Sequence, residues 1–86
     1  MTSREFANMM LKAANERMPA RYQIWLVANR KVKAFGGVVQ EIRFKVYDNY
    51  MEYRRDFRFT ELMMVEPAAE TYGREMAFEF KEAIGI

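Results

Sequence analysis

The chain has 86 residues, of which 51% are hydrophobic and 30% are charged, and its net charge is +2. This length and composition describe one folded domain with a modest core, and they exclude a disordered tail. The sequence contains neither cysteine nor histidine, which excludes a disulfide framework, a thiolate nucleophile and the commonest general base. Because no apolar run approaches a membrane span and the first residues do not resemble a signal peptide, we expect one soluble cytoplasmic domain, residues 1–86.

The charges are unevenly spread along the chain. Basic residues outnumber acidic ones between residues 21 and 58, whereas acidic residues prevail from residue 59 onward. This distribution predicts a basic strand region followed by an acidic C-terminal segment. Such asymmetry can steer a charged partner, and the two halves can also neutralise each other across the fold.

A helix is predicted over residues 3–17. Thr2 followed by Glu5 forms a capping box, and Met1 and Phe6 have the spacing of a hydrophobic staple. Pro19 ends the helix, because the residue before a proline avoids helical backbone angles. The buried stripe at helical spacing is predicted to consist of Phe6, Met9, Met10, Ala13 and Ala14.

A strand is predicted over residues 22–34, where apolar and polar side chains alternate. A turn follows at residues 35–37, because the paired glycines there adopt positive φ angles readily. A three-residue loop is favoured, since it places Ala34 opposite Val38 and keeps the apolar side chains of both strands on one core face.

This strand leaves two alternatives open. A tight turn at residues 29–30 would divide it into two strands of more typical length. The favoured register also places Arg30 and Arg55 in one row with Ile42 on the core face. Because both arginines lie on edge strands, we expect them either to pair with acidic helix residues at the rim or to bind an anion.

A second hairpin is predicted over residues 38–59, where both halves alternate with a period of two. Its loop is placed at Asp48–Asn49, a dipeptide that tolerates the left-handed backbone of two-residue loops. Pairing outward from this loop sets Tyr47 opposite Tyr50 and leaves the apolar side chains together on the other face.

A second helix is predicted from Pro67, which suits a first helical turn, to Gly85, which suits a helix end. The preceding residues 60–66 fit a strand, a short helix or a loop equally well. Gly73 costs the helix about 1 kcal/mol, which packing must offset. The buried stripe is predicted to consist of Ala69, Tyr72, Met76, Phe80, Ala83 and Ile84.

These elements predict a two-layer α+β sandwich in the order helix, three strands, helix, with a three-stranded antiparallel meander and both helices on one face. The order is similar to that of the double-stranded-RNA-binding domain over most of the chain. That family contacts phosphates largely through lysines at the start of its second helix, whereas the matching residues 67–71 are uncharged or acidic. Because function depends on sites rather than folds, the activity of that family is not carried over.

Catalysis is not expected. Ser3 is the only serine and has no recognisable partner, and the glutamates of the second helix are spaced as a solvated face. No loop gathers the oxygen ligands that a hard cation needs. We therefore expect no enzyme activity, no cofactor and no metal.

Several aromatic and apolar side chains are predicted to point away from the core. Trp25 and Val27 have outward parity beside Tyr47 and Tyr50, and Phe78 leaves the buried stripe of the second helix. Exposed aromatic residues with polar neighbours are typical anchors of protein interfaces.

Nucleic-acid binding is the alternative, because basic groups next to aromatic rings are typical of a single-strand-binding platform. Glu41, Glu52 and Asp56 interrupt this basic field. The candidate nucleic-acid-binding residues are Lys31, Lys33, Arg43, Lys45, Arg54 and Arg58.

The sequence therefore favours a small non-enzymatic protein that binds another protein, as an adaptor or an inhibitor. Homodimerisation would also cover the aromatic surface. After protein binding and nucleic-acid binding, the third hypothesis is a structural role, for example as a virion component. Compact, cofactor-free domains of mixed charge are of the kind that phages and mobile elements use to redirect host machinery, but the sequence does not identify the partner.

Overall fold

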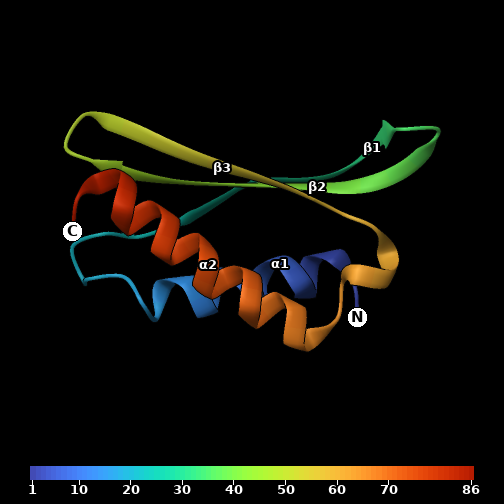
Figure 1. The fold of residues 1–86 in the computed structure, drawn as a ribbon, viewed down its shortest axis with the longest axis horizontal. Coiled ribbons are helices and arrows are strands. Elements are labelled where there is room, and N and C mark those ends of the chain that lie inside the picture. Colours follow the sequence, from blue (N-terminus) through green and yellow to red (C-terminus); the bar gives the residue numbers. More distant parts are fainter.

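A three-stranded antiparallel sheet lies against two helices in the computed structural model of the protein, which describes residues 1–86 (Figure 1). The strands follow one another in chain order, so β2 is central. The elements are α1 (Ser3–Asn15), β1 (Trp25–Ala34), β2 (Gly37–Asp48), β3 (Met51–Phe59), the short 3-10 helix η1 (Glu61–Met63) and α2 (Glu66–Ile84). Both helices lie on the same side of the sheet, which confirms the predicted two-layer α+β fold.

α1 begins with the predicted capping box. The Thr2 hydroxyl accepts a hydrogen bond from the Glu5 backbone N–H, and the Glu5 carboxylate accepts one from the Thr2 N–H, each at 3.1 Å. The helix ends at Asn15 rather than at residue 17. Asn15 then holds the returning chain, because its Oδ1 accepts from the Ile24 N–H at 2.8 Å and its Nδ2 donates to the Ile24 carbonyl at 3.2 Å.

α2 begins at Glu66, one residue before the predicted start, and keeps Pro67 in its first turn. It ends as predicted, with Gly85 as a left-handed cap at φ 91°. Of residues 60–66, which the sequence leaves open, residues 61–63 form η1, residues 60 and 64–65 link it to its neighbours, and Glu66 is the first residue of α2. Gly73 faces α1, and a Cβ atom there would lie 2.6 Å from the Met10 carbonyl oxygen. The glycine that weakens the helix locally is therefore what allows the two helices to pack closely.

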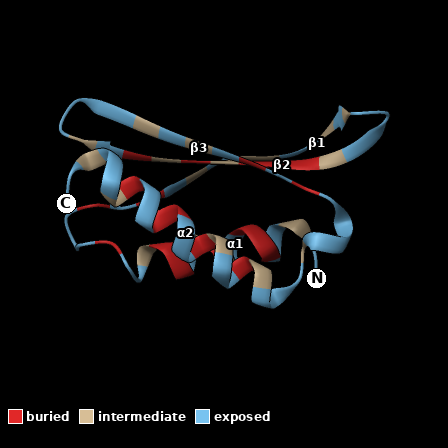
Figure 2. Cartoon of the chain, in the orientation of Figure 1, coloured by how far each residue is buried: buried red, intermediate tan, exposed pale blue.

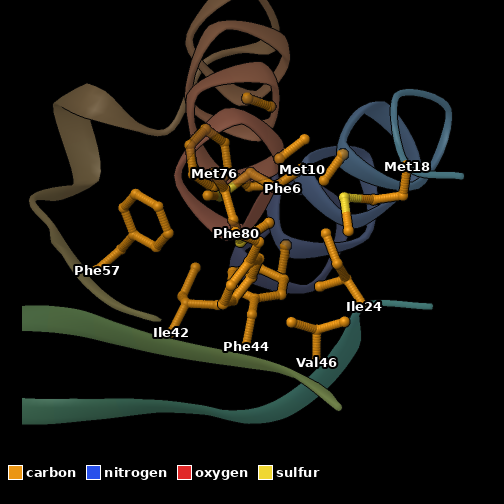
Figure 3. Packing of buried hydrophobic residues seen from close by; sticks show 14 of the residues in the cluster. Phe6, Met10, Met18, Ile24, Ile42, Phe44, Val46, Phe57, Met76 and Phe80 are labelled. Carbon is orange, nitrogen blue, oxygen red and sulfur yellow. The ribbon is translucent and has the colours of Figure 1, made fainter. Parts of the chain in front are cut away.

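The core lies between the inner face of the sheet and both helices (Figures 2 and 3). Phe6 meets Phe59 edge-on with 4.9 Å between ring centroids, and Phe57 stacks on Phe59 at 5.6 Å. The predicted helix stripes are buried except for the half-buried Met9, Tyr72 and Ile84 and the exposed Ala83. The largest fully buried side chains are Phe6, Phe44, Phe59, Met10, Ile24, Ile42, Met76 and Val46.

The loop between β1 and β2 is shorter than predicted. It consists of Phe35 and Gly36, whose φ angles are 50° and 76°, and Ala34 pairs directly with Gly37. Positive φ at both loop residues is the geometry of type I′ hairpins, whose twist matches that of the paired strands. The prediction of a three-residue loop is wrong because it reserved positive φ for glycine, whereas Phe35 adopts it with its side chain fully in solvent.

The shorter loop reverses the faces of residues 28–34 relative to the prediction. Arg30 lies on the outer face of the sheet opposite Glu41, away from the core. Lys31 and Lys33 lie on the helix side instead, at a hairpin end that projects past the helices (Figure 1).

The predicted row of two arginines on the core face is consequently wrong, because Arg30 lies on the outer face and only Arg55 lies on the core face. Arg55 pairs across the strands with Phe44, and its Nε lies 2.6 Å from a carboxylate oxygen of Glu79 in α2. The expected pairing with an acidic helix residue is therefore confirmed for Arg55. Arg30 pairs with the strand residue Glu41 at 3.0 Å.

A β-bulge at Val27 restores the predicted faces at the start of β1. The register shifts around this residue, so that Leu26 points toward the core and Trp25 pairs with Lys45 on the outer face. β1 begins at Trp25 rather than at residue 22, and it continues to its end without a turn. The alternative of two separate strands is therefore wrong.

The loop between β2 and β3 is Asn49–Tyr50, one residue later than predicted. Its first residue has φ 55°, and Asp48 stays in the strand, where it accepts a hydrogen bond from the Tyr22 hydroxyl at 3.1 Å. Moving a two-residue loop by one position shifts the register by two residues, which leaves each side chain on its predicted face. Tyr47 pairs with Glu52, so the predicted pairing of two tyrosines is wrong.

Candidate functional site

One face of the sheet is covered by no other element of the chain (Figure 1). Its aromatic side chains lie toward the Asn49–Tyr50 end, and its charged side chains occupy the middle. The side chains that strand pairing places on this outer face are Trp25, Ala28, Arg30, Val32, Ala34, Val39, Glu41, Arg43, Lys45, Tyr47, Glu52, Arg54, Asp56 and Arg58.

A shallow hollow of about 500 Å³ opens at the aromatic end of this face, and we name it the aromatic hollow. It is lined by Trp25, Leu26, Val27, Lys45 and Tyr47. Trp25 is 50% exposed, Val27 43% and Tyr47 45%. The predicted outward group is therefore confirmed for these three residues, and the bulge is what brings Val27 to the surface next to the rings.

The polar side of the aromatic hollow is a chain of hydrogen bonds. Lys45 Nζ donates to the Tyr47 hydroxyl at 2.8 Å, and this hydroxyl donates to a Glu52 carboxylate oxygen at 3.2 Å. The hydrogen bond to Tyr47 and the nearby Glu52 raise the pKa of Lys45. Arg54 Nε also lies 3.9 Å from Glu52, so two cations share one carboxylate beside the hollow.

Ion pairs fill the middle of the outer face. The Glu41 side chain is only 8% exposed, and its two oxygens lie 3.0 Å from Arg30 and 3.3 Å from Arg58, which come from the two edge strands. Hydrogen bonds from Arg30 lower the pKa of Glu41. Arg43 donates to both oxygens of Asp56, at 2.7 and 3.2 Å, and lowers the pKa of that carboxyl.

The basic residues proposed for nucleic-acid binding do not form one continuous surface. Those on the outer face each form an ion pair with a carboxylate; they are Arg43, Lys45, Arg54 and Arg58. Lys31 and Lys33 lie on the opposite side of the sheet. The shorter β1–β2 loop therefore places these basic residues on two opposite faces of the sheet, whereas the predicted register places all of them on one face.

Two of the predicted anchors lie outside the aromatic hollow. Tyr50 is fully exposed in the β2–β3 loop, and Phe78 is 60% exposed on α2. Leu26 and Lys45 also line the hollow. The alternating pattern does not predict this for Leu26, and it favours only nucleic-acid binding for Lys45. No glycine or proline marks the bulge that shapes the hollow, so the sequence gives no sign of it.

The chain matches no family model, and no curated protein or solved structure is significantly similar to it. No acidic side chains are grouped in a way that could hold a metal ion. Neither helix is both long and apolar enough to cross a membrane.

Proposed function

We propose that the protein is a non-enzymatic adaptor or inhibitor that binds another protein through the aromatic hollow. The observation that carries this proposal is the half-exposed group of Trp25, Val27 and Tyr47 on a sheet face that the chain leaves open. Apolar surface in water is unfavourable, and a partner that covers it gains that free energy. Tryptophan and tyrosine are also the residues most enriched among interface anchors.

The charges at the rim of the hollow indicate the chemistry of the partner. Lys45 and Arg54 share the single carboxylate of Glu52, which leaves local positive charge uncompensated. A partner with carboxylates at its edge would neutralise this charge and associate faster. We therefore expect a partner segment that carries an aromatic or large apolar side chain flanked by acidic residues.

The test compares proteins retained from a nuclease-treated native lysate by the immobilised wild type and by the variant Trp25→Ala. We expect a protein that the wild type retains and the variant loses. Tyr50→Ala is the matched control, because Tyr50 is an exposed aromatic residue outside the hollow, and it should retain the same protein. Equal retention by wild type and Trp25→Ala would contradict the proposal.

A parallel sample without nuclease tests nucleic-acid binding as the other outcome. The ion pairs of Arg43 and Arg58 disfavour it, because phosphates would compete with carboxylates already in place. If the wild type retains RNA or DNA, retention should fall steeply with salt and should be abolished when Arg43, Lys45 and Arg54 are changed to glutamate. That result would replace the protein-binding proposal.

A further inference from the structure

α2 carries on its solvent side the kind of segment that the aromatic hollow is expected to bind. Phe78 is 60% exposed, and helical spacing places Glu75 and Glu82 beside it on the face away from the buried Gly73 and Ala77. Neither glutamate takes part in an ion pair. The helix thus presents an aromatic ring between two carboxylates that form no ion pair, while the neighbouring Arg74 is paired with Glu70 at 3.8 Å.

We infer that α2 of a second copy of this chain occupies the aromatic hollow, with Phe78 against Trp25 and Tyr47. The two surfaces are complementary in charge as well as in apolar character, because the acidic neighbours of Phe78 would approach Lys45 and Arg54. This inference rests on the proposed function, since it uses the same hollow and the same partner chemistry.

The two surfaces lie on opposite sides of the molecule. Both helices lie on one side of the sheet (Figure 1). The hollow opens on the other sheet face, whereas the exposed Phe78 lies on the face of α2 opposite its buried residues. A chain therefore cannot cover its own hollow, and the contact between copies is head-to-tail. Because each added copy brings one new hollow and one new Phe78, the assembly grows with concentration instead of stopping at a dimer.

Sedimentation velocity over increasing protein concentration tests the association. The average mass of the wild type should rise above that of one chain, and a higher salt concentration should weaken the association, because the rim charges are exposed to solvent. Trp25→Ala and Phe78→Ala should each weaken it by about tenfold or more, as expected for aromatic anchors. Tyr50→Ala, which touches neither surface, should associate like the wild type.

An equimolar mixture of Trp25→Ala and Phe78→Ala separates a head-to-tail contact from a symmetric one. The first variant keeps its α2 surface and the second keeps its hollow, so the mixture can form one interface and no more. At a concentration where each variant alone is largely monomeric because of its weakened association, the mixture should form a 1:1 dimer that does not grow further.

The inference is overturned if the wild type stays monomeric, if Phe78→Ala associates like the wild type, or if the mixture stays monomeric where the wild type associates. Misfolding does not obscure the result, because Phe78 is a solvent-exposed helix residue and thermal melting of its variant provides a check. The lysate experiment remains independent. A monomeric wild type that still retains a protein through Trp25 would reject this inference and leave the proposed function standing.

Discussion

Gly73 of α2 lies directly against the backbone of α1 at Met10. A Cβ atom added to Gly73 would be 2.6 Å from the Met10 carbonyl oxygen and 2.9 Å from the Ala13 Cβ. Since the nearest atom belongs to the backbone, it cannot move aside as a flexible side chain would. Even one methyl group therefore forces the two helices apart.

Replacing Gly73 with alanine should lower the free energy of unfolding by about 1–3 kcal/mol, as overpacking of a core does. The change is expected even though alanine is the better helix former by about 1 kcal/mol. Urea denaturation measures it. The control is Gly37→Ala, whose Cβ would lie 3.9 Å from its nearest neighbour and should change stability little. A Gly73→Ala variant as stable as the wild type would refute the close helix contact.

Asn15→Ala removes both hydrogen bonds that hold Ile24 at the entry to the sheet. Because the Ile24 backbone is partly buried, its unpaired N–H and C=O would lower stability by about 1–3 kcal/mol. Urea denaturation of Asn8→Ala, an exposed asparagine of the same helix, provides the comparison. We expect the stability of that control to remain near that of the wild type. An equal loss of stability at both positions would argue against a stabilising role of the two Asn15 hydrogen bonds.

Glu41→Gln removes the negative charge between two guanidinium groups. Arg30 and Arg58 would then face a neutral amide in the middle of the sheet, where the side chain is nearly covered. The melting temperature should fall further than in Glu52→Gln, because Glu52 is more exposed and its ion pairs are longer. Equal decreases in the melting temperatures of the two variants would show that burial does not strengthen the ion pairs of Glu41.

Stability should decrease in acid because of Glu41 and Asp56. Arginine partners lower the pKa of both carboxyls, so the unfolded chain binds protons at a pH where the folded chain does not. Their contribution is complete above the ordinary carboxyl pKa of about 4 and is lost as pH falls below it. Melting temperatures measured down to about pH 2.5 should fall less in Glu41→Gln/Asp56→Asn than in the wild type. Parallel pH profiles would contradict this assignment.

Trp25→Ala should change the free energy of unfolding by no more than about 1 kcal/mol, because half of the side chain is already in solvent. Phe44→Ala on the opposite face of the neighbouring strand should cost about 3–5 kcal/mol, since Phe44 is fully buried. Chemical denaturation of the two variants side by side distinguishes a surface anchor from a core residue. A similar loss of stability in both variants would show that Trp25 is a core residue and would contradict its role in the proposed interface.

The outward position of Trp25 follows from the sequence although two steps toward it are wrong. The three-residue loop assumed at residues 35–37 reverses the faces of β1, and the unforeseen bulge at Val27 reverses them again. The two errors cancel at Trp25 and leave residues 28–34 on the wrong faces. Alternation alone therefore predicts where a strand lies, but its pairing depends on loop geometry and on bulges that no local pattern marks.

Features set by neighbouring residues are predicted well. The Thr2–Glu5 capping box and the Gly85 helix end are confirmed because each depends on a few consecutive residues. The role of Gly73 depends instead on contact with Met10, far away in the chain, which a pattern within one helix cannot indicate. The hydrogen bonds of Lys45 at the hollow are equally hidden, since they require the final strand pairing.

The bulge at Val27 also has a consequence for how the molecule behaves when crowded, because β1 is an edge strand. A regular edge offers a row of unpaired backbone groups that other strands can join, which is the first step toward fibrous aggregates. The bulge breaks the spacing of that row, and Arg30, Lys31 and Lys33 follow it with charges of one sign. β1 is thereby a poor template for amyloid-type growth, even though the neighbouring aromatic rings are left open to water.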